Sequence, residues 1–553
     1  MFRKMRGKLK HLAAVTLIGA MAGGMAACGG AGSNSESGTS SSGTTSATSD
    51  SGSTTSTANS TSSGSKVINV GDAGGNFGGE MASLDPAQEY NGWYLSFYGT
   101  GETLFKLDDN IKPYPVLVES YKVVDDNTWE FIIKDDVTFH NGEKLTAERV
   151  KASFEHMLNA QKRASETYRF DSISADGQTL TIKTTEPTPA LLNDLCDPLS
   201  VVQYIDDSFD YSSMQPPPMT GPFVITNFIA GEKTIMEGYD DYWGGTPKID
   251  TVNLITMADK DALTLALQGG EIDMALEVNP ASIALFSDES KYHMDSIVSS
   301  TTRYVYFNMN GDYKDDVNLR KAVSMSIDRE STEKAGNGTL VAAYGLFSDN
   351  VEFGGTDGLN LSVTKFDLDG AKKLLNDSGY TDSDGDGFLD KDGKKLALGL
   401  VTSTTAEMLD YAQAIQSNLK TIGVDVTIHE YKSVEEATKD GKSWDMALGG
   451  RLLAPSGTFQ YIANVMFVTD SSANSGGYSN PEFDALAKKL ETTFDEAERI
   501  KISKDATQIL FDDAYIAPIV FRKFYAISKN KDKEFNINPS KYYLMDNLID
   551  VEE

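Results

Sequence analysis

A tract of small polar residues at 31–65 divides this chain into a part that can fold and a part that cannot. The tract is almost wholly Ser, Thr, Gly and Ala, carries only Glu36 and Asp50 as charges, and has no aromatic side chain. Such a segment cannot bury enough apolar surface to offset the entropy lost on ordering. We therefore expect a flexible tether over residues 28–65 and a folded body beyond it. The body, about 490 residues, is too long for one hydrophobic core and should hold two or three domains.

The residues before the tether have the layout of a secretory signal. Five basic residues precede an apolar stretch at 12–21, which is shorter than the ~20 residues that a membrane-spanning helix needs. The stretch ends in Met25-Ala26-Ala27-Cys28, which resembles the lipobox of bacterial lipoproteins. The resemblance implies that residues 1–27 are a signal peptide and that Cys28 is lipidated, which places the body at the extracytoplasmic face of the cell membrane. The alternative is an ordinary signal peptide with an incidental cysteine.

The charge and cysteine content narrow the class of protein further. The chain has a net charge of −32, which becomes −37 once the five basic leader residues are removed. A surface this acidic opposes nucleic acids and anionic lipid headgroups, so we expect membrane attachment through the lipid alone and a monomeric body. Cys196 is the only cysteine besides Cys28. It is expected to be a small core residue rather than a nucleophile.

Strand-like and helix-like stretches alternate along the body. Alternating apolar and polar residues predict strands at 128–134 and 179–182. Thr146, Asp367 and Asn480 are each predicted to begin a helix, since their side chains can accept hydrogen bonds from free backbone N–H groups. This interleaving predicts α/β layers with mixed sheets.

No catalytic constellation is visible, so we do not expect an enzyme. The histidines are scattered without metal-ligand spacing, and no G-x-S-x-G sequence occurs. A secreted hydrolase, the alternative from another class, would need a nucleophile–base or carboxylate pair.

One segment, 382–390, has the spacing of a calcium-binding loop. Oxygen donors stand at positions 1, 3, 5 and 9, and Gly387 stands at position 6, where the loop turns sharply. Position 12 is Gly393, where an EF-hand has a bidentate Glu. A structural calcium site and a metal-free acidic hairpin loop both remain open, and no other cofactor is expected. The candidate metal residues are Asp382, Asp384, Asp386, Phe388 and Asp390.

Several sequence blocks, taken together and in order, resemble one family. They extend from about Asn69 to Asn530, and each block is weak by itself. The ordered set resembles the extracytoplasmic solute-binding proteins of peptide-type ABC importers, the oligopeptide/dipeptide/nickel-binding family 5. The blocks include SLDPA at 83–87, GETLF at 101–105, PVLVES at 115–120, VTFHNG at 137–142, LTAERV at 145–150, TGPF at 220–223, GEID at 270–273 and IDR at 327–329.

This resemblance implies an α/β, two-lobed, type II periplasmic-binding-protein-like fold, with a hinge, a cleft, and an extra domain on the first lobe. Ligand would lie in the cleft, and closure of the lobes would bury it. Mapped onto this chain, lobe I comprises 66–108, 216–300 and 522–553, the extra domain comprises 109–215, and lobe II comprises 301–521.

The family's ligand contacts can be carried over to matching positions. Glu102, Thr103 and Leu104 resemble the lobe I segment that pairs with a peptide main chain. In lobe II the matching positions are 450–454, but the family's aromatic is replaced by Arg451 and its amine-binding Asp by Ala454. Arg451 could hold a carboxylate or phosphate, or could be a surface residue. The full implied ligand set is Glu102, Thr103, Leu104, Asn308, Gly450, Arg451, Leu452, Ala454, Phe521 and Arg522.

The resemblance implies a lipid-anchored receptor that captures peptides and delivers them to the permease subunits of an ABC importer. Binding of an oligosaccharide or a metal chelate such as nickel is the alternative within the same class. A sensory or adhesive lipoprotein that keeps the fold without a transporter is a further possibility.

Overall fold

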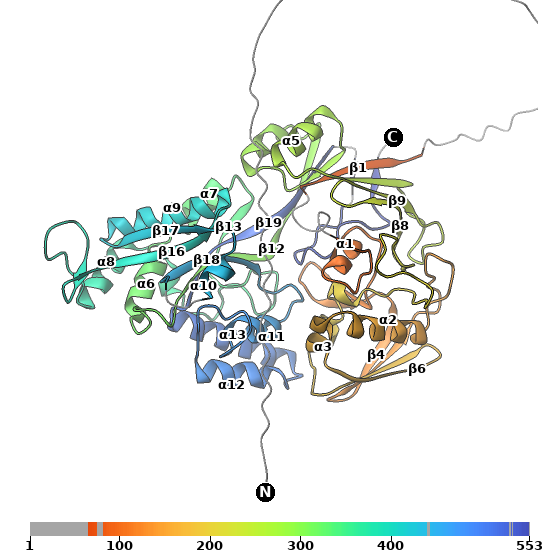
Figure 1. The fold of residues 1–553 in the computed structure, drawn as a ribbon, viewed down its shortest axis with the longest axis horizontal. Coiled ribbons are helices and arrows are strands. Elements are labelled where there is room, and N and C mark those ends of the chain that lie inside the picture. The colour runs from red at the N-terminus through yellow and green to blue at the C-terminus, as the bar shows by residue number, and fades with distance from the viewer. Residues whose placement is uncertain (1–64, 74–80, 440–442, 530–531, 534, 552–553) are drawn as a thin grey trace, which may run out of the picture. The chain divides into compact units, whose positions relative to one another are not determined.

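A single continuous sheet extends through both lobes of the body (Figure 1). The computed structural model describes residues 65–73, 81–439, 443–529, 532–533 and 535–551. Within them an 11-stranded sheet has the order β17-β16-β18-β12-β19-β11-β1-β10-β9-β8, and β13 (Leu340–Ala342) pairs with β19 outside this path. The predicted signal peptide, Cys28 and nearly all of the tether lie outside the described residues.

Two long strands carry this sheet from one lobe to the other. β12 (Tyr292–Phe307) and β19 (Ile516–Lys529) are antiparallel over most of their length. Their register breaks between Val298 and Thr302 and returns at Phe521. A break in the ladder is where a sheet bends most easily, so this position is the hinge. The predicted crossings at 300/301 and 521/522 lie at this break.

Lobe I is the half of the sheet beyond β19. β1 is parallel to β10 and β11, whereas β9 is antiparallel to both β8 and β10. The elements are β1 (Val67–Asp72), α1 (Asn91–Phe97), β8 (Phe223–Ile229), β9 (Lys233–Gly238), β10 (Thr251–Thr256), α5 (Lys260–Gly269), β11 (Met274–Leu276) and the 3₁₀ segment η2 (Pro280–Phe286). β2 (Phe105–Leu107) and β3 (Pro113–Pro115) form a short hairpin, as do β20 (Asp532–Lys533) and β21 (Asp550–Val551).

A separate four-stranded sheet lies within the predicted extra domain. Its order is β4-β5-β7-β6, and α2 packs on β6 and β7. The predicted strands and the Thr146 cap are confirmed, since Thr146 Oγ1 accepts a hydrogen bond from the backbone N–H of Arg149. The elements are β4 (Val118–Asp125), β5 (Thr128–Ile133), α2 (Ala147–Ala160), α3 (Lys162–Tyr168), β6 (Phe170–Asp176), β7 (Thr179–Thr184), α4 (Leu191–Asp194) and η1 (Pro198–Ser200).

Lobe II is built on β16, β17 and β18 with helices around them. Asp367 and Asn480 cap α8 and α12 as predicted. The elements are α6 (Val317–Met325), α7 (Arg329–Ala335), η3 (Ser362–Thr364), α8 (Leu368–Asp377), β14 (Asp390–Lys391), β15 (Lys394–Lys395), β16 (Ala397–Ser403), α9 (Ala406–Thr421), β17 (Asp425–Tyr431), α10 (Val434–Thr438), β18 (Met446–Leu452), α11 (Phe459–Ile462), the π-helical η4 (Ala463–Phe467), α12 (Pro481–Leu490) and α13 (Glu496–Asp512).

The extra domain and lobe II touch at the end opposite the hinge. Asn193 Nδ2 donates a hydrogen bond of 2.8 Å to the Ser456 carbonyl, and Lys112 forms an ion pair with Glu352. One hydrophobic cluster contains buried side chains of both parts, among them Phe131 and Phe459. We call this arrangement, in which the two sides of the cleft are in contact, the closed form. The α/β, two-lobed fold class is confirmed, whereas the exact domain limits stay predictions.

Candidate functional site

The candidate site is a cavity of about 720 Å³ in lobe II. It lies between β18 on one side and the segment that runs from the end of β17 into α10 on the other. Side chains from β12, η4 and the loop before Tyr478 close the remaining walls. The residues that line it include Arg303, Tyr304, Asn310, Lys432, Glu435, Lys439, Gly450 and Arg451.

The cavity exists because two neighbouring strands separate. β16 and β18 are parallel and pair only at Leu400 with Met446 and at Val401 with Ala447. Beyond Ala447, β18 continues to pair with β12, but no described strand pairs with its other edge. Backbone polar groups along this edge therefore face the cavity and are free to meet a ligand, in the manner of strand addition.

Two glycines in β18 let side chains from β12 cross beneath the strand. A Cβ on Gly449 would lie 2.3 Å from the Tyr304 ring, and a Cβ on Gly450 would lie 2.0 Å from Arg303 Nη1. Such distances are too short for carbon contacts, so both positions require glycine for this packing. Gly450 was predicted as a ligand residue, and it does line the cavity.

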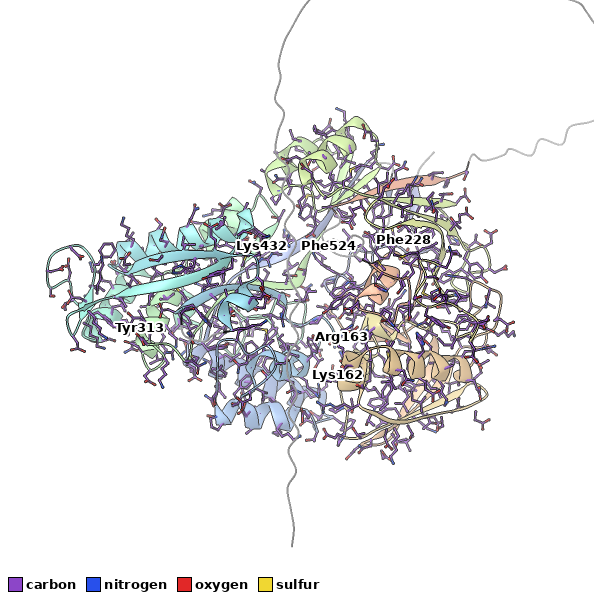
Figure 2. All side chains as sticks on the ribbon, in the orientation of Figure 1. Lys162, Arg163, Phe228, Tyr313, Lys432 and Phe524 are labelled. Atoms are coloured by element: carbon purple, nitrogen blue, oxygen red, sulfur yellow. The ribbon has the colours of Figure 1, made fainter. Side chains whose placement is uncertain are left out.

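Positive charge gathers around the cavity although the chain has a net charge of −32. Arg451, Lys432 and Lys439 line it, and Glu435 is the one carboxylate among the described residues that line it (Lys432 is labelled in Figure 2). Arg303 also lines it, with its Nε and Nη2 each 3.0 Å from the Glu407 carboxylate. Guanidinium and ammonium groups at a walled cavity suit an anionic ligand.

An aromatic cluster lies near Arg451 on the other side. We call Tyr90, Trp93, Tyr461 and Tyr542 the interlobe aromatic cluster. Trp93 packs edge-on against Tyr542 with ring centroids 5.1 Å apart, and the Arg163 guanidinium lies over the Tyr90 ring at 5.1 Å.

Tyr461 lies within electrostatic reach of two arginines, one on each side of the cleft. Burial raises the pKa of its phenol, and Arg163 and Arg451 are both near enough to oppose that rise. Arg163 belongs to α3 of the extra domain and Arg451 to β18 of lobe II, so guanidinium groups from both sides of the cleft approach one phenol (Figure 2 labels Arg163). Tyr90 and Tyr461 are 58% and 38% exposed.

The structure places Arg522 in an ion-pair chain rather than alone on the cleft wall. Its Nη2 donates a hydrogen bond of 3.3 Å to Glu277 Oε1, and its Nε lies 3.6 Å from Glu407 Oε1. Phe521 precedes it in β19 and is only 7% exposed.

The predicted lobe I segment Glu102-Thr103-Leu104 is buried and internally bonded. The Glu102 carboxylate accepts hydrogen bonds from Tyr242 Oη and Trp243 Nε1, each at 2.9 Å. The backbone oxygens of Glu102 and Leu104 accept N–H groups of neighbouring segments at 2.8 and 3.0 Å. Two of the main-chain groups that strand addition would use are thus already occupied by the protein itself.

Other predicted ligand residues also face the interior. Asn308 donates a hydrogen bond of 2.7 Å to the Trp444 carbonyl, while Asn310 lines the cavity in its place. Ala454 is 1% exposed and belongs to the hydrophobic core, which explains why an apolar residue stands where an Asp was looked for. Leu452 ends β18 and is half-buried.

The acidic loop gathers only part of the predicted calcium ligands. Single carboxylate oxygens of Asp382, Asp384 and Asp386 all lie within 4.8 Å of one another, and all three residues are exposed. Asp390 instead accepts hydrogen bonds from the hydroxyl of Ser383 at 2.7 and 2.8 Å. Ser383 thus occupies both oxygens of Asp390 in this structure, and the calcium site stays a prediction. Phe388 donates its backbone N–H to Asp386 Oδ1 at 2.8 Å, and its carbonyl oxygen as a metal ligand stays a prediction.

Cys196 is buried and reduced, as predicted. Burial raises the pKa of its thiol well above the ordinary value, so it is not a nucleophile at neutral pH. Among the described residues no helix is both long and apolar enough to cross a bilayer.

Several cavity residues carried no sequence signal. Arg303, Lys432 and Glu435 lie in segments with no motif. They belong to the site because the fold places them close to β18. Tyr90 and Arg163 follow the recognised blocks 83–87 and 145–150 closely, so proximity to those blocks is the one signal that could have indicated them.

The chain is similar to curated binding proteins over most of its length. It is 28% identical over 456 residues to the nickel-binding protein NikA of Staphylococcus aureus, covering 82% of this chain and 89% of that protein. It is 26% identical to the dipeptide-binding protein DppE of Bacillus subtilis, covering 83% of this chain and 87% of DppE.

Solved structures share the fold. NikA from Staphylococcus aureus in complex with Ni(L-His)₂ superimposes with a TM-score of 0.71 at 26% identity, covering 88% of this chain and all of that one. The model of the bacterial extracellular solute-binding proteins, family 5 (middle part), matches residues 112–473. The family resemblance seen in the ordered sequence blocks is thereby confirmed, and this chain belongs to the bacterial extracellular solute-binding proteins of family 5.

Proposed function

We propose that this protein is a receptor that captures a small, carboxylate-bearing solute between its lobes and delivers it to an ABC importer. The observation that carries the proposal is the cationic cavity of a strongly acidic chain. Arg451, Lys432 and Lys439 surround about 720 Å³, beside Arg303 in its pair with Glu407, and Glu435 is the one carboxylate among the described residues that line the cavity. An anion that enters gains charge-assisted hydrogen bonds from groups that the fold already holds in place.

Among carboxylate-bearing solutes, a metal–amino-acid chelate is the first candidate. A chelate supplies its own metal ligands, so the receptor needs only to bind its carboxylates and pack against its rings. No described residue that lines the cavity is a histidine, which fits this division of labour. NikA of Staphylococcus aureus, a relative at 28% identity, has been solved with Ni(L-His)₂.

A short peptide is the second candidate, and Glu435 favours it. A peptide's α-ammonium in a closed cleft needs a carboxylate partner, because an unpaired buried charge is expensive. Ala454 cannot serve, but Glu435 lines the cavity and could. The free edge of β18 would pair with a peptide main chain in a sequence-tolerant way.

A thermal-shift panel separates these candidates. The full chain, unfolded and refolded to remove carried-over solute, is heated with Ni²⁺ plus two equivalents of L-histidine, with Ni²⁺ alone, with L-histidine alone, and with short peptides bearing free or acetylated N-termini. A ligand at 100 times its Kd stabilises by about 2.7 kcal/mol. We expect the nickel–histidine chelate to raise the melting temperature more than Ni²⁺ alone or L-histidine alone does. A shift in melting temperature with peptides but not with the chelate would favour the second candidate. No shift with any of these ligands would contradict a carboxylate-bearing ligand.

We further propose that Cys28, outside the described residues, anchors the protein through a lipid. The argument is the basic leader, the short apolar stretch and the small residues before the cysteine. The Cys28→Ala variant should be found in the medium, whereas the parent stays in the membrane fraction. Cys196→Ala is the matched control, since that cysteine is buried. Membrane retention of Cys28→Ala would contradict the anchor.

A further inference from the structure

Five charged side chains form one ion-pair chain through the hinge. Arg303 holds Glu407 with two hydrogen bonds of 3.0 Å. Arg522 lies 3.6 Å from Glu407 and donates a hydrogen bond of 3.3 Å to Glu277. Lys541 closes the chain with a hydrogen bond of 3.1 Å to the same oxygen of Glu277.

The two ends of this ion-pair chain lie at the lobe II cavity and at the interlobe aromatic cluster. Arg303 lines the lobe II cavity. At the other end, the backbone oxygen of Lys541 accepts a hydrogen bond of 2.6 Å from Trp93 Nε1, in the interlobe aromatic cluster. Arg522 stands between them on β19, one of the two strands that cross from lobe to lobe.

Charge neutralisation alone does not explain Arg522. The ion-pair chain has three cations and two carboxylates. Without Arg522 each carboxylate would still keep one cation, Arg303 for Glu407 and Lys541 for Glu277. Taking the Arg522 guanidinium partly out of water costs free energy, and its other interactions must offset that cost. Arg522 is the single member that contacts a carboxylate of each lobe.

The Glu277 end is held in an unfavourable backbone conformation. Glu277 has φ of +47°, a region that residues other than glycine rarely adopt, and it is 8% exposed. Its backbone N–H donates to the Tyr525 carbonyl of β19 at 3.1 Å, which fixes the carboxylate beside the crossing strand. Although burial alone would raise its pKa, Lys541 and Arg522 lower the pKa of Glu277 to about 2, so it is ionised at neutral pH.

We propose that Arg522 is a positioning residue that couples the lobes, holding Glu277 of lobe I and Glu407 of lobe II together in the closed form and favouring that form over the open one. Bending at the break in the β12–β19 ladder would move the two carboxylates apart, and Arg522 could then keep only one of them. The inference holds for any solute that binds between the lobes and does not depend on which solute it is.

The test measures interlobe distance in the solute-free protein. Spin labels are placed at the exposed Lys183→Cys in the extra domain and Lys373→Cys in lobe II, in a full chain with Cys28→Ser so that only these thiols react. Pulsed electron resonance gives the populations of short and long distances. We expect Arg522→Met to lower the ratio of closed to open about ten-fold, the effect of one charge-assisted contact. Arg522→Lys, whose single ammonium can contact one carboxylate well, should fall between.

Lys529→Met is the matched control, since Lys529 pairs with Asp273 inside lobe I at 2.7 Å. It should leave the distances unchanged. Melting temperatures and circular dichroism establish that each variant is folded, and Arg522→Lys provides the decision where Arg522→Met does not fold. Unchanged populations in both Arg522 variants would overturn the proposal, as would a parent with no short-distance population without solute.

A second reading of the same variants separates coupling from simple structural damage. With Ni²⁺ and two equivalents of L-histidine as probe, dissociation should accelerate about ten-fold in Arg522→Met while association stays within two-fold. If this probe fails to bind the parent, the proposed ligand is wrong, but the distance measurement still decides the role of Arg522.

Discussion

Arg451 is the residue on which anion binding in the cavity depends most. It lines the cavity and lies within electrostatic reach of Tyr461 of the interlobe aromatic cluster. Removing a charged hydrogen-bond donor costs about 1.5–3 kcal/mol, so Arg451→Ala should weaken binding of the nickel–histidine probe about 10- to 100-fold. The melting temperature should change little, because Arg451 is only half-buried. Calorimetric titration measures the first effect and a thermal scan the second.

Arg169→Ala is the matched control for Arg451. Arg169 pairs with Glu186 at 2.9 Å and is 37% exposed at its side chain, and it does not line the cavity. It should leave affinity unchanged. Equal affinity of Arg451→Ala and the parent would make Arg451 a bystander.

Glu277 should make stability depend on acidity below pH 4.5. Its pKa falls from 4.5 to about 2 on folding, so its contribution is complete above pH 4.5 and is lost as pH falls toward 2. A shift of this size corresponds to about 3 kcal/mol. In urea unfolding, the stability difference between the parent and Glu277→Gln should be largest at pH 7 and shrink progressively from pH 4.5 to 2.5. A difference that stays constant over this range would contradict the assignment.

At the scale of elements, the acidic loop 382–390 offers a direct test of metal binding. Asp382, Asp384 and Asp386 converge, whereas Asp390 is held by Ser383. If calcium binds there, millimolar calcium should raise the melting temperature of a chelator-stripped sample, and Asp384→Asn should abolish the rise. Asp357→Asn, an exposed aspartate outside the loop, should not. No rise in the parent would leave the loop an acidic hairpin.

Local elements could be predicted from the sequence because their signals are local. Thr146, Asp367 and Asn480 cap helices with side-chain hydrogen bonds to residues two or three positions ahead. The pairing of strands could not be predicted in this way. β1 pairs with β10, about 180 residues later, and the early separation of β16 from β18 creates the cavity. No local pattern reports either event.

The sequence predicted only part of the candidate site. Gly450 and Arg451 were found because they match a family segment, and both line the cavity. Glu102 was taken from the same kind of match, yet its carboxylate is bound by Tyr242 and Trp243. A family motif marks a position in the chain but does not say whether a buried neighbour already occupies that side chain.

At the scale of the whole molecule, the two lobes form one mechanical unit. β12 and β19 supply the hinge, and contacts such as Asn193 with Ser456 close the opposite end. A solute that contacts both Arg163 and Arg451 would bind the closed form more tightly than the open form. That difference in affinity would shift the equilibrium toward the closed form. Membership in family 5 fits this account, since an extracellular solute-binding protein must hold its cargo and then release it.

The claim that this receptor recognises carboxylates is tested most directly by replacing the carboxylate of the ligand with an uncharged amide. The refolded full chain is titrated in a calorimeter with Ni²⁺ bound by L-histidine and, separately, by L-histidinamide, which keeps the amine and imidazole but lacks the acid. We predict an affinity at least about ten-fold lower for the histidinamide chelate, the loss of one charge-assisted contact. Equal affinities would show that the cationic cavity does not bind the carboxylate, and would contradict the account.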